Sequence, residues 1–314
     1  MSAFVEGPET LPVAQANFGT VGDYFALLKP RVMSLVLFTG IVGLVLAPGT
    51  IALATAFTAL LCIAVGAGAS GALNMAYDAD IDALMARTKG RPVPQGHLTA
   101  GEATAFGAVL AVGSVSVMGL LVNPVAAALL AFTIGFYVFV YTMWLKRRTP
   151  QNIVIGGLAG ALPPAIGWAA VTGSLGLPPL ILVGIIFLWT PPHFWALSLY
   201  RVEDYARARI PMLPVVSGKA ETRLQIVVYT MLVVGSGFLP AILGFGGPLY
   251  LAANTGIGIW FVVQALRVAR ERNTEREPQA RKLFGVSILY LFALFAALLV
   301  ETAAGIGPIT PLIG

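Results

Sequence analysis

Long apolar segments alternate with short polar or Gly- and Pro-rich connections along nearly the whole chain. An α-helix rises 1.5 Å per residue, so about 20 apolar residues cross a hydrocarbon core of about 30 Å. The pattern therefore predicts an all-α integral membrane protein with nine transmembrane helices. The predicted spans are Val32–Ala47, Ile51–Ala72, Ala103–Val122, Val125–Leu145, Ile153–Val171, Pro178–Leu199, Leu224–Leu243, Leu249–Leu266 and Leu283–Ala304.

The amino-terminal residues lie outside this pattern. Residues 1–20 contain no Lys or Arg and no uninterrupted apolar core, so they match neither a secretory signal nor a mitochondrial presequence. We expect residues 1–23 to form a flexible cytoplasmic tail and residues 24–314 to form a single nine-helix membrane domain.

The composition and the positions of the charges agree with this topology. Only 11% of the residues are charged and 58% are hydrophobic, which excludes a soluble globular domain. All 19 Lys and Arg residues fall in alternate connections, on one predicted side of the membrane. The positive-inside rule then predicts a bacterial inner-membrane protein with a cytoplasmic amino terminus and a periplasmic carboxyl terminus. Membrane orientation accounts for the net charge of +5, so no nucleic-acid partner is needed.

The connection after the second span carries an ordered set of acidic residues. If the helix continues through it, Asn74, Asp78 and Asp82 follow one another at intervals of four and form one polar stripe. Asp80 points to another side of the helix and is expected to face solvent.

This stripe indicates a site for a metal ion and a phosphorylated substrate. Like charges four residues apart repel unless a cation lies among them, and oxygen ligands suit Mg²⁺. Mg²⁺ is normally held by one or two carboxylates together with phosphate oxygens. Arg87, Lys89 and Arg91 follow within two turns and would contact the remaining phosphate oxygens. The alternative is a solvated acidic helix end followed by ordinary cytoplasmic cations.

A second acidic connection follows the sixth span. Glu203 and Asp204 precede Arg207, Arg209 and a proline-rich segment, again in the order acid, base, proline. Four spans separate the two connections, so both emerge on the cytoplasmic face. That spacing is typical of a parallel internal repeat with a site between its halves, where two acidic loops can hold two metal ions across a diphosphate.

Several longer motifs carry a resemblance to a known family. They are Asn74-x-x-x-Asp78-x-x-x-Asp82-x-x-Met85-x-Arg87-Thr88-x-x-Arg91-Pro92, Tyr141-Thr142-x-x-Leu145-Lys146-Arg147, Trp189-Thr190-Pro191-Pro192-His193-Phe194, and Asp204-Tyr205 followed by Ile210-Pro211-Met212-Leu213-Pro214. From Lys29 onward the chain resembles the UbiA superfamily of intramembrane prenyltransferases, and more finely the branch that acts on protohaem. The second superfamily motif is D-x-x-x-D, but Tyr200 stands here where its first Asp would be.

The resemblance implies a UbiA-type bundle of two four-helix repeats plus one helix. It implies Mg²⁺-assisted transfer of a farnesyl group from farnesyl diphosphate to the vinyl group of protohaem IX, with addition of water. The implied partners are the lipid bilayer and either a haem A synthase or the assembly of a terminal oxidase.

The resemblance also implies roles for single residues. Tyr137 and Tyr141, four residues apart, would line the prenyl pocket and shield a carbocation; the alternative is an aromatic belt at the headgroup level. His193 would ligate haem iron or orient the porphyrin; the alternative is a ring that caps carbonyls freed by the paired prolines. The implied metal ligands and catalytic residues are Asn74, Asp78, Asp82 and Asp204, and the implied diphosphate partners are Arg87, Arg91, Lys146, Arg207 and Arg31.

Two other functions compete with this one. A UbiA-type enzyme for an aromatic or quinone-precursor acceptor would keep the same metal stripe, and His193 behind its prolines favours haem. A membrane transporter would need ionisable residues near the bilayer midplane, whereas the acids here crowd one face.

Overall fold

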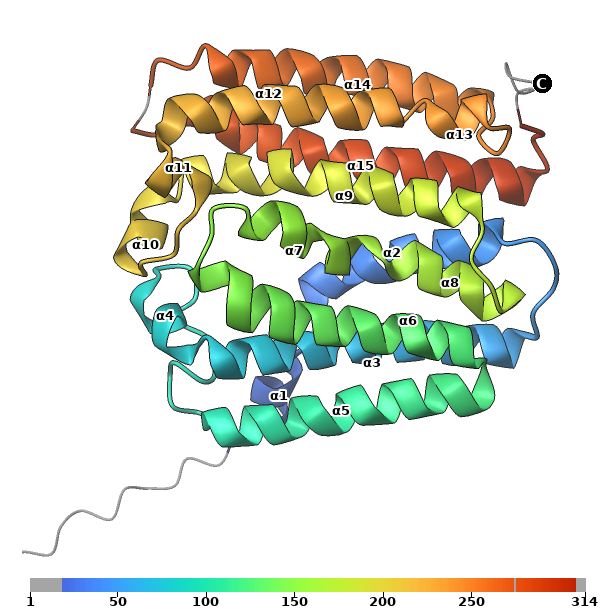
Figure 1. Cartoon of the computed structure of the whole chain (residues 1–314), viewed down its shortest axis with the longest axis horizontal. Coiled ribbons are helices and arrows are strands. Elements are labelled where there is room, and N and C mark those ends of the chain that lie inside the picture. The colour runs from blue at the N-terminus through green and yellow to red at the C-terminus, as the bar shows by residue number, and fades with distance from the viewer. Residues whose placement is uncertain (1–18, 274, 309–314) are drawn as a thin grey trace, which may run out of the picture.

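The computed structural model describes residues 19–273 and 275–308, except for the side chain of Arg31. Every regular element in these ranges is helical (Figure 1). In chain order the elements are α1 (Val21–Leu27), α2 (Pro30–Leu46), α3 (Leu53–Tyr77), α4 (Ala79–Leu84), α5 (Ala100–Leu121), α6 (Pro124–Gly135), the π-helix η1 (Phe136–Trp144), the 3₁₀ turn η2 (Leu145–Arg147), α7 (Asn152–Ala161), α8 (Pro163–Thr172), α9 (Leu177–Leu199), α10 (Val202–Arg207), α11 (Leu213–Val216), α12 (Gly218–Ser236), α13 (Leu239–Ile242), α14 (Pro248–Ala269) and α15 (Pro278–Ala304).

The helices reproduce the predicted membrane pattern. Within the described residues, eight helical segments are long and apolar enough to cross a membrane. The bent pair of α1 and α2 makes a ninth when it is counted as one span. The prediction of an all-helical, multi-pass membrane protein is therefore confirmed, and the count of nine spans agrees with the structure.

Three of the predicted spans are not simple α-helices. Pro124–Arg147 passes from α6 into η1 and η2, Asn152–Thr172 consists of α7 and α8, and Gly218–Ile242 consists of α12 and α13. Pro163 begins α8 and Pro240 lies in the first turn of α13. A proline has no backbone N–H to donate, so the helical hydrogen-bond ladder is interrupted at both places.

Helix α1 begins inside the segment that the sequence assigned to the tail. The Thr20 hydroxyl accepts a hydrogen bond from the Asp23 N–H, and the Asp23 carboxylate accepts one from the Thr20 N–H. The other Asp23 oxygen lies 2.9 Å from His97 Nδ1. This capping box starts the helix at Val21, so residues 21–23 of the predicted tail are helical. Residues 1–18 of the predicted tail lie outside the described ranges.

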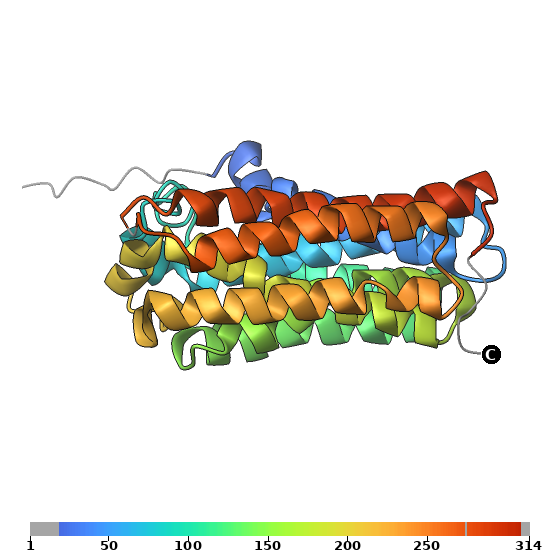
Figure 2. The ribbon, with the colours of Figure 1, turned by 90° about the horizontal axis from the view of Figure 1, so that it is seen from above.

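The long helices run side by side, and the short helices α4, α10 and α11 gather at one end of the bundle (Figure 1). Figure 2 shows the same grouping at one end of the bundle, seen from above. The two acidic connections therefore lie at the same end, as the repeat pattern predicted. This end also carries the connection between α14 and α15 with its arginines.

Small residues let α2 and α8 approach closely. A Cβ on Gly43 would lie 2.0 Å from the Pro164 carbonyl oxygen, and one on Gly167 would lie 2.1 Å from the Gly40 carbonyl oxygen. Membrane helices associate through such close backbone packing, because lipid supplies little hydrophobic drive between them. The contact holds α2 and α8 against each other.

A separate apolar cluster joins the two acidic connections. Ile81 and Met85 from the first connection pack with Tyr205, Ile210 and Met212 from the second. All of these side chains are buried. The cluster therefore holds α4 against α10 and sets the position of the polar residues beside it.

Candidate functional site

The Asn74, Asp78 and Asp82 side chains are all buried, at 3%, 0% and 2% exposure. The helix does not continue through them as predicted, because α3 ends at Tyr77 and α4 starts at Ala79. The Asp78 carboxylate accepts a 2.7 Å hydrogen bond from Asn74 Nδ2, and such local side-chain bonds compete with regular helix. The backbone bonds from Asp78 N to Asn74 O and from Asp82 N to Asp78 O keep the four-residue spacing. The predicted polar stripe therefore survives the break.

Cations neutralise this stripe in the structure. Lys146 pairs with the Asp78 carboxylate, and Arg91 Nη1 lies 2.5 Å from Asp82 Oδ2. Lys29 Nζ donates to Asn74 Oδ1 at 2.7 Å. The spacing of the acids predicted a cation among them. In the structure, basic side chains from three separate connections lie in that place.

A hydroxyl and a second arginine complete the first half of the site. Thr142 in η1 is fully buried, and its Oγ1 lies 3.1 Å from Asn74 Nδ2. Arg147 reaches Asp78 at 3.4 Å and binds both oxygens of Asp80 at 2.7 and 2.8 Å. Asp80 is exposed, as predicted, and the hydrogen bonds from Arg147 lower the pKa of its carboxyl.

Asp204 from the second connection lies against the first connection. Its Oδ1 is 3.5 Å from the backbone nitrogen of Ala86 and 3.5 Å from Arg207 Nη1. Its Oδ2 is buried and has no hydrogen-bond partner among the described residues, with Arg201 Nη1 at 3.8 Å. Glu203 is exposed, so of these two acids only Asp204 turns inward.

Arginines cover the aromatic rings of the second connection. Arg87 lies 5.7 Å above the ring of Tyr205, which links the two connections once more. Arg281 and Arg201 lie 4.6 and 5.9 Å from the ring of Tyr200. Burial raises the pKa of the Tyr200 hydroxyl. The position that holds an Asp in the wider superfamily is therefore a neutral aromatic ring beside two cations.

The donor set fits a hard divalent cation that binds together with phosphate. Among the described residues, no three His, Cys, Asp or Glu side chains form a ready-made metal site. Asn74, Asp78, Asp82 and Asp204 nevertheless offer oxygen ligands only, and Asp204 Oδ2 has no competing hydrogen bond. Mg²⁺ needs few protein ligands when phosphate oxygens supply the others.

The two tyrosines of the fourth span stand next to each other. Tyr137 and Tyr141 lie in the π-helix η1, and their ring centroids are 5.3 Å apart. Thr142, the residue after Tyr141, contacts Asn74 of the polar stripe. The structure therefore brings both tyrosines to the acidic site, although its helix is π and not the α-helix expected from the sequence.

A pair of glycines in α7 tests the placement of Tyr141. A Cβ on Gly156 would lie 2.2 Å from Cδ2 of Tyr141, whereas one on Gly160 would meet nothing within 4 Å. We expect Gly156→Ala to displace the Tyr141 ring and lower prenyl transfer about tenfold. Gly160→Ala should leave activity unchanged and stabilise the helix by up to about 1 kcal/mol. Rates and thermal unfolding of both variants check this, and equal rates would contradict a role for Tyr141.

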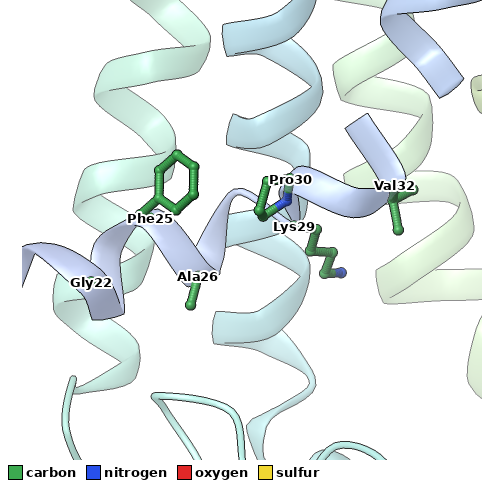
Figure 3. Close-up of a pocket in the computed structure, with 6 residues that line it drawn as sticks. All are labelled: Gly22, Phe25, Ala26, Lys29, Pro30 and Val32. Carbon is green, nitrogen blue, oxygen red and sulfur yellow. The ribbon is translucent and has the colours of Figure 1, made fainter. Parts of the chain in front are cut away.

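A shallow pocket of about 350 Å³ opens at the break between α1 and α2 (Figure 3). Phe25 and Val32 line it, together with Lys29, which extends from the break and reaches Asn74. The Lys29 side chain therefore links this pocket to the polar site. The side chain of Arg31, a predicted diphosphate partner, lies outside the described part of the structure.

His193 lies on the side of α9 that faces α15. Its ring is stacked between Trp189 and Phe284, with both centroids at 4.3 Å. Its Nδ1 lies 2.8 Å from Ser287 Oγ. Among the described residues, the hydrogen-bond partner of the ring is this hydroxyl rather than a carbonyl freed by Pro191 or Pro192. Its role toward haem stays a prediction.

Sequence reasoning gave no role to four residues of these clusters, although two of them stand in a quoted motif: Lys29, Thr142, Arg147 and Ser287. Lys29 and Arg147 looked like ordinary cytoplasmic cations, and Thr142 and Ser287 are small polar residues inside apolar spans. Their partners lie 45 to 94 residues away in the sequence. Thr142 and Arg147 had a sequence signal, because both stand in the motif that contains Lys146.

The model of the UbiA prenyltransferase family matches residues 36–292. The chain belongs to this family. Protoheme IX farnesyltransferase from Parvibaculum lavamentivorans is 60% identical over 300 residues, which cover 95% of this chain and 94% of that protein. The protein of the same name from Azorhizobium caulinodans is 60% identical over 298 residues, which cover 94% and 96%.

Solved structures of the UbiA family share the fold. A digeranylgeranylglyceryl phosphate synthase superposes with a TM-score of 0.74 at 21% identity, covering 90% of this chain and 99% of that one. A UbiA homologue from Archaeoglobus fulgidus, bound to DMAPP and Mg²⁺, gives a TM-score of 0.64 at 15% identity, covering 88% and 99%. These likenesses establish that the helical bundle is that of intramembrane prenyltransferases.

Proposed function

We propose that this protein transfers the farnesyl group of farnesyl diphosphate to the vinyl group of protohaem IX, with addition of water, and so forms haem O. The proposal rests on the relatives from Parvibaculum lavamentivorans and Azorhizobium caulinodans. Both are named protoheme IX farnesyltransferase, and both match this chain over nearly their whole length. The buried stripe beside the cations supports a diphosphate substrate but does not choose the acceptor.

In this proposal the oxygens of Asn74, Asp78, Asp82 and Asp204 hold Mg²⁺. The bound ion would neutralise charge that develops on the diphosphate as the allylic carbon–oxygen bond breaks. Asp78 and Asp82 are paired with Lys146 and Arg91 in the structure. When substrate binds, Lys146 and Arg91 would leave these carboxylates for the diphosphate, and Asp78 and Asp82 would then be free to hold the metal ion.

The cations act on the diphosphate oxygens. Lys146 and Arg91 already lie within the buried cluster, and Lys29 reaches it from the pocket between α1 and α2. At the second connection, Arg87 lies over the ring of Tyr205 and Arg207 lies next to Asp204. Fixed positive groups of this kind stabilise a leaving group without any protein nucleophile.

The aromatic residues protect the cation that remains. The faces of Tyr137 and Tyr141 attract positive charge and exclude water from the farnesyl carbon until the vinyl group attacks. The new carbon–carbon bond leaves a cation on the acceptor side chain. A water molecule then adds its oxygen there and loses a proton, which gives the hydroxyethylfarnesyl group.

The proposal includes the cellular setting. The distribution of all 19 cations supports a bacterial inner membrane with the site and the amino terminus facing the cytoplasm. The haem O formed there would pass to a haem A synthase or to the assembly of a terminal oxidase.

The acceptor can be tested directly. Membranes that contain the protein are given farnesyl diphosphate with either protohaem or 4-hydroxybenzoate, and the products are identified by mass. We expect protohaem to gain one farnesyl group and one hydroxyl group, with no prenylated benzoate. Prenylation of the benzoate alone would overturn the assignment.

A further inference from the structure

Two side chains of α9 converge on one residue of α15. Trp189 Nε1 donates a 2.7 Å hydrogen bond to the backbone carbonyl of Ser287, and His193 Nδ1 lies 2.8 Å from the Ser287 hydroxyl. Ser287 is fully buried and His193 is 7% exposed. The first and last residues of the Trp-Thr-Pro-Pro-His motif, Trp189 and His193, therefore both contact Ser287.

The direction of the hydrogen bonds follows from the atoms present. Ser287 Oγ lies 2.7 Å from the carbonyl oxygen of Phe284, which can only accept. Two oxygens at this distance repel unless a proton lies between them, so the serine hydroxyl donates to Phe284. The hydroxyl oxygen then accepts from His193, and the imidazole proton is on Nδ1.

These hydrogen bonds leave a lone pair on Nε2 of His193. In the neutral ring, a proton on Nδ1 leaves Nε2 free to accept or to bind a metal. Nε2 has no hydrogen-bond partner among the described residues. Trp189 and Phe284 cover both ring faces, so the ring cannot turn to exchange its two nitrogens without losing this stacking.

We propose that Ser287 is a positioning residue, which holds His193 in the tautomer that presents Nε2 as a ligand to the iron of the acceptor. The inference rests on the proposed function, because it needs a haem acceptor. Partners of this kind in other metal sites fix ring orientation, and their loss weakens metal binding about 10–100-fold.

The test uses the full chain in detergent, titrated with ferric protohaem and followed by the Soret band. We expect a Soret shift with the natural protein and its loss with His193→Ala. Ser287→Ala should weaken binding about 10–100-fold and lose the shift, while Ser287→Thr, which keeps a hydroxyl, should restore it. Ser198 is the matched control, because it is also fully buried and also donates to a carbonyl three residues earlier. Ser198→Ala should bind like the natural protein.

A Ser287→Ala protein with the natural Soret band and affinity would overturn the inference, as would a natural spectrum in His193→Ala. Should Ser287→Ala fail to fold, Ser287→Cys keeps the size with a weaker acceptor and should change the band in the same direction. Product formation by the natural protein is measured in parallel. If the natural protein farnesylates protohaem but the Ser287→Ala spectrum is unaltered, only the positioning role of Ser287 is refuted. If the natural protein does not form that product, the proposed function is refuted.

Discussion

Asp78→Asn is expected to lower kcat/KM for farnesyl diphosphate by about 10²–10³-fold, a loss of the size seen when one group that stabilises developing charge is removed. Asp78 is fully buried and accepts from Asn74 and Lys146, with Arg147 at 3.4 Å. The asparagine keeps the shape and one acceptor oxygen but removes the charge. Both the proposed metal ligand and the counter-ion of Lys146 are then lost.

Asp80→Asn is the matched control. Asp80 lies two residues away in the same connection, but its side chain is 63% exposed. Arg147 retains Asp78 as a partner, so activity should stay within about twofold of the natural protein. Steady-state rates at saturating protohaem compare the two variants, and thermal unfolding verifies that both are folded. Similar rates for Asp78→Asn and Asp80→Asn would argue against the stripe as the metal site.

Asp204→Asn is expected to lower kcat/KM by about 10²-fold, because a single carboxylate represents the second acidic motif in this chain. Its buried Oδ2 has no hydrogen bond, and its Oδ1 faces the backbone of Ala86. Tyr200 replaces the other acid of the motif and the adjacent Glu203 is exposed, so neither position supplies a buried carboxylate that could take its place.

The adjacent residue supplies the control for Asp204. Glu203 is exposed, so Glu203→Gln should leave the rate and the Mg²⁺ concentration for half-maximal activity unchanged. Asp204→Asn should raise that Mg²⁺ concentration as well as lower the rate. A normal Mg²⁺ dependence in Asp204→Asn would mean that this carboxylate serves only the structure of the second connection.

The fold was largely predictable because hydrophobic length is a direct signal of a membrane span. The breaks within spans were not, since they depend on tertiary contacts. The π-helix η1, for example, contains Thr142, which meets Asn74, and Tyr141, which packs on Gly156. No local pattern in an apolar segment reveals these neighbours.

The candidate site was predicted in part. The spacing of Asn74, Asp78 and Asp82 survives in the structure because the backbone bonds across the break at Asp78 still join residues four apart. The ion pairs of the cluster were not foreseen, since every cytoplasmic cation is also a topology marker. Which of the 19 cations turn inward is decided by packing, as Lys29 and Lys146 show.

The central claim is that the two acidic connections act on one metal–diphosphate complex. The apolar contact of Met85 with Tyr205 and the approach of Ala86 to Asp204 bring them together. If the claim holds, Asp78 and Asp204 are coupled, and their effects on binding are not independent.

Calorimetric binding of pyrophosphate, with and without Mg²⁺, tests this most directly in the natural protein, Asp78→Asn, Asp204→Asn and the double variant. We expect binding that needs Mg²⁺, at least tenfold weaker binding in each single variant, and little further loss in the double variant. Binding that is independent of Mg²⁺, or a double loss equal to the product of the two single losses, would contradict the account.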